Sequence, residues 1–403
     1  MNRLTRLLNS SLLILTTLLV ACGGGGYSPE TGDRGEFVSA AAKGSYTAAS
    51  LQSLTAQNYP VFNTFTPSIA HDVKTYVITY WTVDTDGEPV KASGLLAIPN
   101  NHDTSSTRLV GYHHGTVFHT ADVPTNLPEF DVMSAILASM DFIVILPDYI
   151  GYGESVDRLH PYMHATSLAN SSIDLMRAAG FFMSATDIPY SKQVLLGGYS
   201  EGGYAALATH KMIQAQHADE FDVIATYAGA GAYDLLSTAE TLLGMDTLPY
   251  APYVAFMFKA YDEIYGFNRI SEIFNPAYVD TVNNYFYGNY HESVIEPKLT
   301  NDTASLLNSV FLADFRSSGE TEIKARLTEN NIYDWSPLAP VRLFHGADDM
   351  VVPYANAVTA LAGMTQNGTE DVKIIGCSAS GSANHSNCFA PYLESMTEYF
   401  LMP

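Results

Sequence analysis

Residues 198–202 read Gly198-Tyr199-Ser200-Glu201-Gly202, a Gly-x-Ser-x-Gly pentapeptide. Between a strand and a helix, this pattern is typical of a nucleophile elbow, a sharp turn that lifts a serine hydroxyl clear of the backbone. The turn is so tight that we expect only glycine to fit at Gly198 and Gly202. The pattern therefore predicts a nucleophilic Ser200, and the alternative is an ordinary glycine-rich turn.

Strand and helix patterns alternate on both sides of this pentapeptide. An apolar run predicts a buried strand over Gln193 to Gly197, and a helix follows from Gly203 to about Gln216. Seven more strands are expected at Lys74 to Val83, Ala92 to Ile98, Leu109 to His113, Phe142 to Leu146, Val223 to Ala228, Val341 to His345 and Val372 to Ile375. Further helices are expected at Asp131 to Met140, Ala165 to Met183 and Tyr392 to Phe400. The alternation predicts an α/β fold with a mainly parallel, eight-stranded sheet flanked by helices.

One long segment interrupts the alternation. Residues 235–335 show no convincing strand, and residues 241–335 contain nine Tyr and seven Phe. Because structureless connections of this length are uncommon, we interpret residues 235–335 as a helical cap inserted between two parts of the core, 51–234 and 336–403. The cap residues expected to face a substrate cavity are Phe256, Met257, Phe258 and Tyr261. The alternative is that these side chains pack the cap's own core.

The N-terminus has the features of an export signal. Residues 1–21 combine two early arginines with an apolar stretch too short to span a bilayer. The sequence Leu19-Val20-Ala21-Cys22 resembles the lipobox of bacterial lipoproteins, in which the cysteine is lipidated; a plain signal peptide is the alternative. Residues 22–50 are rich in small residues and predict a flexible tether. We therefore expect an exported protein anchored through Cys22 to the bacterial cell envelope, in the outer membrane if the cell is Gram-negative.

Cysteine count and net charge narrow the environment and the partners. With Cys22 lipidated, Cys377 and Cys388 remain, and in an exported chain a disulfide between them is the simplest arrangement, with two free thiols as the alternative. Closing that loop stabilises the fold by roughly 3 kcal/mol. The formal net charge of −23 excludes a nucleic-acid partner and favours neutral or apolar substrates.

A serine nucleophile needs a base and an acid that orients the base, and candidates for both follow Ser200. The segment from His345 to Pro353 resembles the His-Gly-x-x-Asp-x-x-Val-Pro acid loop of α/β-hydrolases. Its motif assigns the acid to Asp349, with the neighbouring Asp348 as the alternative. His385 follows the last predicted strand and is the expected base, which gives the chain order Ser-Asp-His.

An oxyanion hole needs backbone N–H donors near the serine. We expect the N–H of Glu201 as one donor and that of Thr116 as the other, with Gly115 allowing the turn. A metal cluster of His113, His114 and His119 is the alternative for that segment. Because no carboxylate or cysteine is seen at ligand spacing nearby, we expect no metal.

Together these motifs resemble α/β-hydrolases of the esterase and lipase kind, and in particular secretory lipases related to yeast lipase A. The element Pro147-Asp148-Tyr149-Ile150-Gly151 matches a Pro-Asp-Tyr-x-Gly segment of those lipases, and the similarity spans residues 74 to 400. The resemblance implies the α/β-hydrolase fold and hydrolysis of small-molecule carboxylic esters through an acyl-enzyme, with no cofactor. Glu201 departs from it, because many relatives carry Gln or Ala there.

Two other functions stay open at this point. A serine peptidase of the prolyl-peptidase kind shares the triad and its order, and Glu201 or the pair Asp262-Glu263 would then recognise the amino end of a peptide. A non-catalytic, surface-binding lipoprotein is the third possibility.

Overall fold

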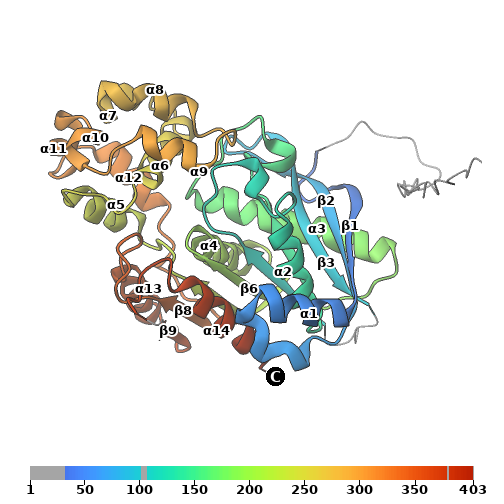
Figure 1. Cartoon of the computed structure of the whole chain (residues 1–403). Coiled ribbons are helices and arrows are strands. Elements are labelled where there is room, and N and C mark those ends of the chain that lie inside the picture. Colours follow the sequence, from blue (N-terminus) through green and yellow to red (C-terminus); the bar gives the residue numbers. More distant parts are fainter. Residues whose placement is uncertain (1–31, 101–106, 379–380, 403) are drawn as a thin grey trace, which may run out of the picture. The chain divides into compact units, whose positions relative to one another are not determined.

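The computed structural model of this protein describes residues 32–100, 107–378 and 381–402. Its central element is a nine-stranded sheet (Figure 1). The strand order is β1-β2-β3-β5-β4-β6-β7-β8-β9. The strands are β1 (Phe37–Tyr46), β2 (Val73–Val83), β3 (Pro89–Pro99), β4 (Arg108–His113), β5 (Phe142–Pro147), β6 (Gln193–Tyr199), β7 (Asp222–Gly229), β8 (Val341–His345) and β9 (Val372–Gly376). In this order, every pair of neighbours from β5 to β9 is parallel. The pairs β1 with β2, β2 with β3 and β3 with β5 are antiparallel. The prediction of a mainly parallel α/β sheet is confirmed.

The count of eight strands is wrong by one, because β1 lies in the segment predicted as a tether. Its sequence, Phe-Val-Ser-Ala-Ala-Ala-Lys-Gly-Ser-Tyr, is short of large apolar residues because it forms a partly exposed edge strand that pairs with β2. Helix α1 (Ala48–Asn58) follows at once, capped by the Thr47 side chain, which accepts a hydrogen bond from the Ser50 N–H. The tether prediction is therefore wrong from residue 37 onward. Residues 1–31, which include the predicted signal peptide and Cys22, lie outside the described residues.

Both faces of the sheet are buried by helices. Along β5, Val144 packs into a core formed with α2 (Pro128–Ala138) and α14 (Phe389–Leu401), whereas Ile145 packs into a core on the opposite face with α3 (Ala165–Ala185). Successive side chains of a strand point to opposite faces, which explains the continuous apolar run in this strand. Helices α4 (Glu201–Gln216) and α13 (Ala355–Gln366) complete the helices outside the cap. Short 3-10 helices are η1 (Pro60–Ser68), η2 (Thr120–Asp122), η3 (Gly153–Ser155) and η4 (Glu296–Lys298).

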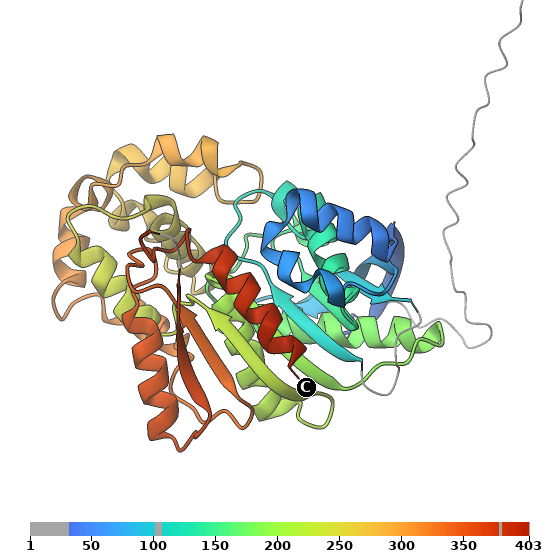
Figure 2. The same ribbon diagram turned by 60° about the horizontal axis from the view of Figure 1, so that its bottom comes forward.

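Between β7 and β8 the chain forms helices and no named strand, and residues 235–335 are called the cap below. Figures 1 and 2 show these helices gathered beyond one end of the sheet. The cap helices are α5 (Leu235–Gly244), α6 (Ala251–Ile264), α7 (Ile270–Ile273), α8 (Pro276–Asn284), α9 (Glu292–Ile295), α10 (Thr303–Leu306), α11 (Ser309–Phe315) and α12 (Thr321–Glu329). Aromatic side chains fill the cap's interior; the Phe258 ring, for example, meets that of Phe311 edge-on at 5.4 Å.

Candidate active site

The pentapeptide forms a strained turn between β6 and α4. Ser200 is the single residue between the two elements, and its backbone angles are φ +60° and ψ −124°. A non-glycine residue rarely adopts this conformation, and it persists only where the surroundings enforce it. A Cβ at Gly198 would lie 2.2 Å from the Gly202 carbonyl oxygen, and one at Gly202 would lie 2.0 Å from that of His113. The steric argument made from the sequence for both glycines therefore holds.

Buried hydrogen bonds fix this turn to its neighbours. The Ser200 N–H donates to the Gly229 carbonyl at 2.8 Å. The Gly198 N–H donates to the Tyr392 hydroxyl at 2.6 Å, and that hydroxyl donates to the Tyr227 carbonyl at 2.9 Å. Because Tyr392 lies on the C-terminal helix α14, the last helix of the chain helps to hold the turn in its strained conformation.

The three residues predicted as a catalytic triad meet in one hydrogen-bonded chain. His385 Nε2 lies 2.9 Å from Ser200 Oγ, and His385 Nδ1 lies 2.6 Å from Asp349 Oδ2. With Nδ1 facing a carboxylate, the imidazole carries its proton there and presents an unprotonated Nε2 to the serine. This geometry allows His385 to accept a proton from the Ser200 hydroxyl.

The surroundings of Asp349 favour the ionised form of its side chain. Its side chain is buried, and Oδ1 accepts hydrogen bonds from the N–H groups of Val351 at 3.0 Å and Val352 at 2.9 Å. Burial raises the pKa of the carboxyl, but hydrogen bonds from His345 and His385 outweigh this effect and hold the pKa at about 2. Asp349 therefore stays ionised throughout the neutral range.

Asp348, the alternative acid, has a different environment. It is exposed, and Oδ2 accepts hydrogen bonds from the Ser382 hydroxyl and the Ala383 N–H, both at 3.0 Å. These contacts tie the acid loop to the loop that carries His385. Asp348 thus supports the position of the imidazole without contacting it.

The predicted disulfide between Cys377 and Cys388 is confirmed, with the two Cα atoms 5.8 Å apart. It closes the loop that carries His385, and Cys388 is fully buried at the start of α14. The Tyr199 hydroxyl donates to the His385 carbonyl at 2.7 Å. The loop of His385 is therefore held in two ways, by a covalent bridge and by a hydrogen bond from the residue that precedes Ser200.

The predicted oxyanion donors are the N–H groups of Glu201, which follows Ser200, and of Thr116, which follows Gly115. Glu201 begins α4, and N–H groups in the first turn of a helix lack intrahelical partners. Gly115 lies against the turn, since a Cβ there would be 3.2 Å from the Tyr199 carbonyl oxygen and 3.8 Å from the Ser200 Cβ. Next to it, the Thr116 hydroxyl is 3.0 Å from the Tyr162 hydroxyl. Glu201 and the segment around Gly115 therefore both lie next to Ser200.

The Glu201 side chain forms a buried pair that the sequence reading missed. Its Oε1 lies 2.7 Å from His160 Nε2, and His160 Nδ1 lies 2.8 Å from the Ile150 carbonyl oxygen. Both ring nitrogens face an acceptor, so one proton must lie between Nε2 and the carboxylate, on either group. The pair as a whole is therefore neutral and places no uncompensated negative charge beside Ser200. The signal was the unusual Glu201 itself, but nothing in the sequence linked it to His160.

An apolar pocket lies over Ser200 and Glu201. Its volume is about 50 Å³, and its walls come from the core and from the cap. The lining residues beyond Ser200 and Glu201 are Tyr162, Met163, Ala232, Leu235, Thr238, Leu242, Tyr253, Val254, Met257, Val351 and Val352. Ligand pockets commonly measure 300–1,000 Å³, so this one is closed to large substrates as it stands.

Of the four predicted cap residues, Met257 lines this pocket. The other three pack elsewhere. The Phe256 ring stacks on that of Tyr162 at 4.7 Å, Phe258 lies in the cap's aromatic interior, and the Tyr261 hydroxyl donates to the Met163 carbonyl at 3.1 Å. The expectation for these three is corrected: successive residues of α6 point in different directions, and the pocket faces one side of that helix.

The histidines that precede Gly115 do not form the metal cluster considered as an alternative. His113 is buried, with Nδ1 3.0 Å from the Gly197 carbonyl oxygen and Nε2 3.0 Å from the Ser172 hydroxyl. Burial lowers the pKa of His113 to about 4. His114 has its Nδ1 2.7 Å from the Gly115 carbonyl oxygen. Both imidazoles are thus engaged in holding the strand ends around Ser200.

No helix among residues 32–100, 107–378 and 381–402 is long and apolar enough to cross a membrane.

Comparison with known proteins gives the family. The family model for secretory lipases matches residues 118–391. Among solved structures, a rice cell wall degrading esterase, LipA from Xanthomonas oryzae, is 26% identical with a TM-score of 0.79, covering 92% of this chain and 97% of its own. A presumed hydrolase of Legionella pneumophila is 27% identical, with a TM-score of 0.82 and coverage of 91% and 97%.

More distant similarity supports the fold alone. Candida antarctica lipase A is 14% identical, with a TM-score of 0.64 and coverage of 92% of this chain and 83% of its own. A search of curated proteins finds no match. The sheet, the turn at Ser200 and the family match agree, and they confirm the predicted α/β-hydrolase fold: the chain belongs to the secretory lipase family and is an exported ester hydrolase.

Proposed function

We propose that this protein is a serine esterase in which Ser200 is the nucleophile, His385 the general base and Asp349 the residue that orients and stabilises the imidazole. The observation that carries the proposal is the continuous hydrogen-bonded chain of 2.9 Å and 2.6 Å through the two nitrogens of His385. The strained turn supports it, because strain of this kind concentrates at functional sites.

In the first half of the reaction, Ser200 Oγ attacks the ester carbonyl carbon while His385 Nε2 takes the hydroxyl proton. The negative charge that develops on the carbonyl oxygen is stabilised by the N–H groups of Thr116 and Glu201, with Gly115 leaving room for it. The tetrahedral intermediate then collapses, the bond to the alcohol oxygen breaks, and His385 gives its proton to the leaving alcohol. An acyl group remains on Ser200.

In the second half, water replaces the alcohol. His385 Nε2 removes a proton from the water as it attacks the acyl carbonyl, and it returns the proton to Ser200 Oγ when the acid departs. Asp349 remains ionised throughout and stabilises the transient imidazolium. No cofactor takes part in these steps.

The pocket supports a preference for small, uncharged acyl groups. Its walls are mostly aliphatic, including Leu235, Val254 and Met257, and its volume is about 50 Å³. A longer chain requires the cap to move. The Xanthomonas oryzae esterase is named for degrading rice cell wall, which adds cell-wall esters to the substrates to be tested.

The peptidase alternative has less support. Glu201 is already paired with His160. Asp262 Oδ1 accepts a hydrogen bond from the Arg269 N–H at 2.6 Å, and Glu263 pairs with Lys259 at 3.0 Å. These acidic groups are occupied by the protein itself, so none offers an unpaired carboxylate to the amino end of a peptide.

A panel of p-nitrophenyl esters of two to twelve acyl carbons, assayed beside aminoacyl p-nitroanilides, tests the proposal. We expect ester turnover that is greatest at two to four carbons, is lost in Ser200→Ala, and greatly exceeds anilide turnover. Faster anilide cleavage would favour a peptidase, and no turnover of any substrate would favour a binding protein.

We also propose that Cys22 is lipidated and that the segment after it links the enzyme to the bacterial cell envelope. The support is the lipobox-like sequence of residues 19–22. Metabolic labelling with an alkyne fatty acid tests it: we expect label in the wild type and none in Cys22→Ser. Equal labelling of the two proteins would rule the anchor out.

A further inference from the structure

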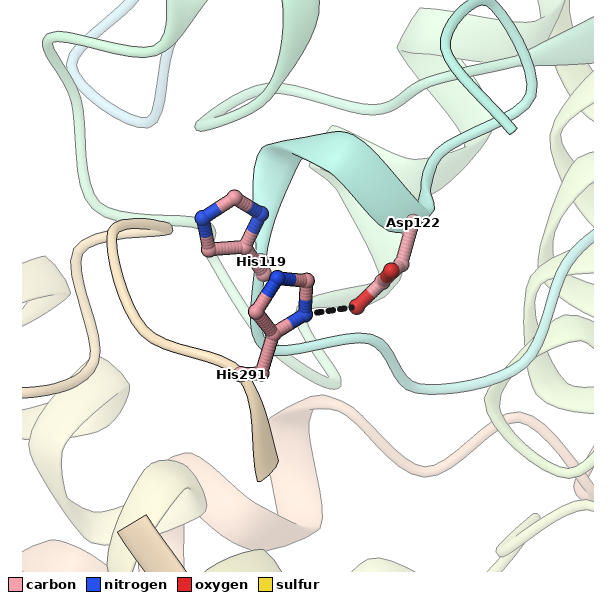
Figure 3. Close-up of side chains that lie close together, drawn as sticks. All are labelled: His119, Asp122 and His291. Atoms are coloured by element: carbon pink, nitrogen blue, oxygen red, sulfur yellow. Dashed lines mark hydrogen bonds and ion pairs between the residues drawn. The ribbon is translucent and has the colours of Figure 1, made fainter. Parts of the chain in front are cut away.

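Three side chains of metal-binding type meet where the cap contacts the core, outside the pocket of Ser200. His119 and Asp122 lie at the two ends of η2, and His291 precedes the cap helix α9 (Figure 3). One ligand atom from each residue lies within 4.8 Å of the others. His291 Nδ1 is 3.1 Å from Asp122 Oδ2, and the two imidazole rings stack with centroids 3.9 Å apart. Two imidazoles and a carboxylate therefore share one small volume.

Main-chain hydrogen bonds join the two segments that carry this cluster. His119 and Asn289 form an isolated antiparallel bridge, and the Thr120 N–H donates to the Gly288 carbonyl at 2.9 Å. These bonds join two segments that lie 169 residues apart in sequence at Asp122 and His291. The side chains are thus brought together by the fold, and their proximity does not depend on their own attraction.

We propose that His119, Asp122 and His291 form a binding site for a divalent transition-metal ion of the zinc type, with water completing the coordination. Zinc sites that keep an open position use this kind of ligand set, two histidines and a carboxylate. Calcium and magnesium prefer sites made of oxygen ligands, so they fit this cluster poorly. The His291 side chain is 51% exposed, which leaves room for water ligands.

The histidine nitrogens must be unprotonated and must point at the same ion. His119 Nδ1 accepts a hydrogen bond from the Ala121 N–H at 2.9 Å, and the two ring planes are 14° apart. An ion must therefore displace that bond or turn the His119 ring, and the exposed His291 ring must also turn. Because of this rearrangement we expect weaker binding than at a closed structural zinc site.

An ion at this site would connect the cap to the segment that carries Thr116, a proposed oxyanion donor. His119 follows Thr116 by three residues, whereas His291 belongs to the cap. If the cap must move to admit long acyl groups, as the proposed function holds, a bound ion would restrict that movement. Turnover of long esters would then fall more than turnover of short ones. This consequence rests on the proposed function, but ion binding itself does not.

Calorimetric titration of the chelator-treated protein with ZnCl₂ tests the site directly. We expect one ion per chain in the wild type and at least a tenfold weaker affinity in His119→Ala and in His291→Ala. His71→Ala is the matched control, because His71 is also partly exposed but lies outside the cluster, and it should bind as the wild type does. With CoCl₂, the wild type should show visible ligand-field absorption that both cluster variants lose.

Absence of zinc binding in the wild type would overturn the proposal. So would binding that is unchanged in both cluster variants, or equally weakened in His71→Ala. The Ser200→Ala variant separates this proposal from the proposed function. It should bind zinc normally, so loss of ester turnover with intact zinc binding, or the reverse, assigns a failure to one proposal alone.

Discussion

Ser200→Gly should make this protein more stable than Ser200→Ala, although both variants lack the nucleophile. Ser200 has φ +60° and ψ −124°, a conformation in which a Cβ is unfavourable and glycine is not. Both variants lose the same hydrogen bond between Ser200 Oγ and His385 Nε2. The difference between them therefore isolates the backbone strain of the turn.

The size of the difference follows from two opposing effects. A non-glycine residue in such a region costs of order 1–3 kcal/mol. Glycine gives the unfolded chain more freedom, which lowers stability by about 0.5–1 kcal/mol relative to alanine. We expect Ser200→Gly to exceed Ser200→Ala by about 0.5–2 kcal/mol in free energy of unfolding.

Urea unfolding at pH 7, followed by far-ultraviolet circular dichroism with the disulfide intact, measures this difference. Ser53 is the matched control, since it is exposed within α1 and has ordinary helical geometry. There the order should reverse, with Ser53→Gly about 1 kcal/mol less stable than Ser53→Ala. If Ser53 behaves in this way and Ser200→Gly is still no more stable than Ser200→Ala, the turn is not strained and the reasoning fails.

Four further predictions follow from the site. Asp349→Asn should lower kcat by about 10⁴-fold, because the imidazole loses its preferred tautomer, whereas Asp348→Asn should lower kcat less than tenfold. The opposite order in steady-state assays would assign the role of the acid to Asp348. The Asp349 pKa of about 2 lies below its ordinary value of 3.8, so the ionised carboxylate contributes about 2 kcal/mol of stability above pH 3.8, which is lost as the pH falls through 2. In urea unfolding, the difference in stability between wild type and Asp349→Asn should therefore shrink by about 2 kcal/mol from pH 5 to pH 2. A constant difference would contradict the lowered pKa of Asp349. Cys377→Ala should affect kcat more strongly than the melting temperature, because the bridge restrains the loop that carries His385. An unchanged rate in the absence of the bridge would show that this restraint does not matter for turnover. Met257→Trp should reduce turnover of butyrate esters more than that of acetate esters, and equal losses on both would place the acyl group elsewhere.

The sequence predicted most of the sheet because its strands are buried on both faces. Strands such as β5 and β6 read as continuous apolar runs, and this pattern survives without knowledge of tertiary contacts. β1 carried no such signal. As an edge strand it buries little, so its small residues resembled a linker, and its pairing with β2 depends on neighbours distant in sequence.

The residues of the proposed triad were predictable because each stands in a motif with fixed chain order. The choice between Asp348 and Asp349 is more subtle, since adjacent residues share every compositional feature. The structure separates them by burial: Asp349 faces His385, and Asp348 binds the backbone of the loop beyond it.

Contacts between segments that lie far apart in the chain could not be predicted from the sequence. His160 meets Glu201 across 41 residues, and His291 meets Asp122 across 169, without a local motif for either pair. The expectation that no carboxylate lies at ligand spacing near His119 overlooked Asp122, three residues later, whereas His291 comes from the cap and could not be linked to His119 by any local motif. The orientation of α6 also depends on how the cap packs, which explains why Met257 alone of its four predicted residues lines the pocket.

Peptide mass spectrometry after reaction with a fluorophosphonate is the most direct examination of the proposed catalytic serine, since the reagent forms a stable adduct with an activated hydroxyl. We predict one adduct per chain, on the peptide that contains Ser200, and much slower labelling in His385→Ala. An adduct on another residue, or labelling that persists in Ser200→Ala, would contradict the mechanism.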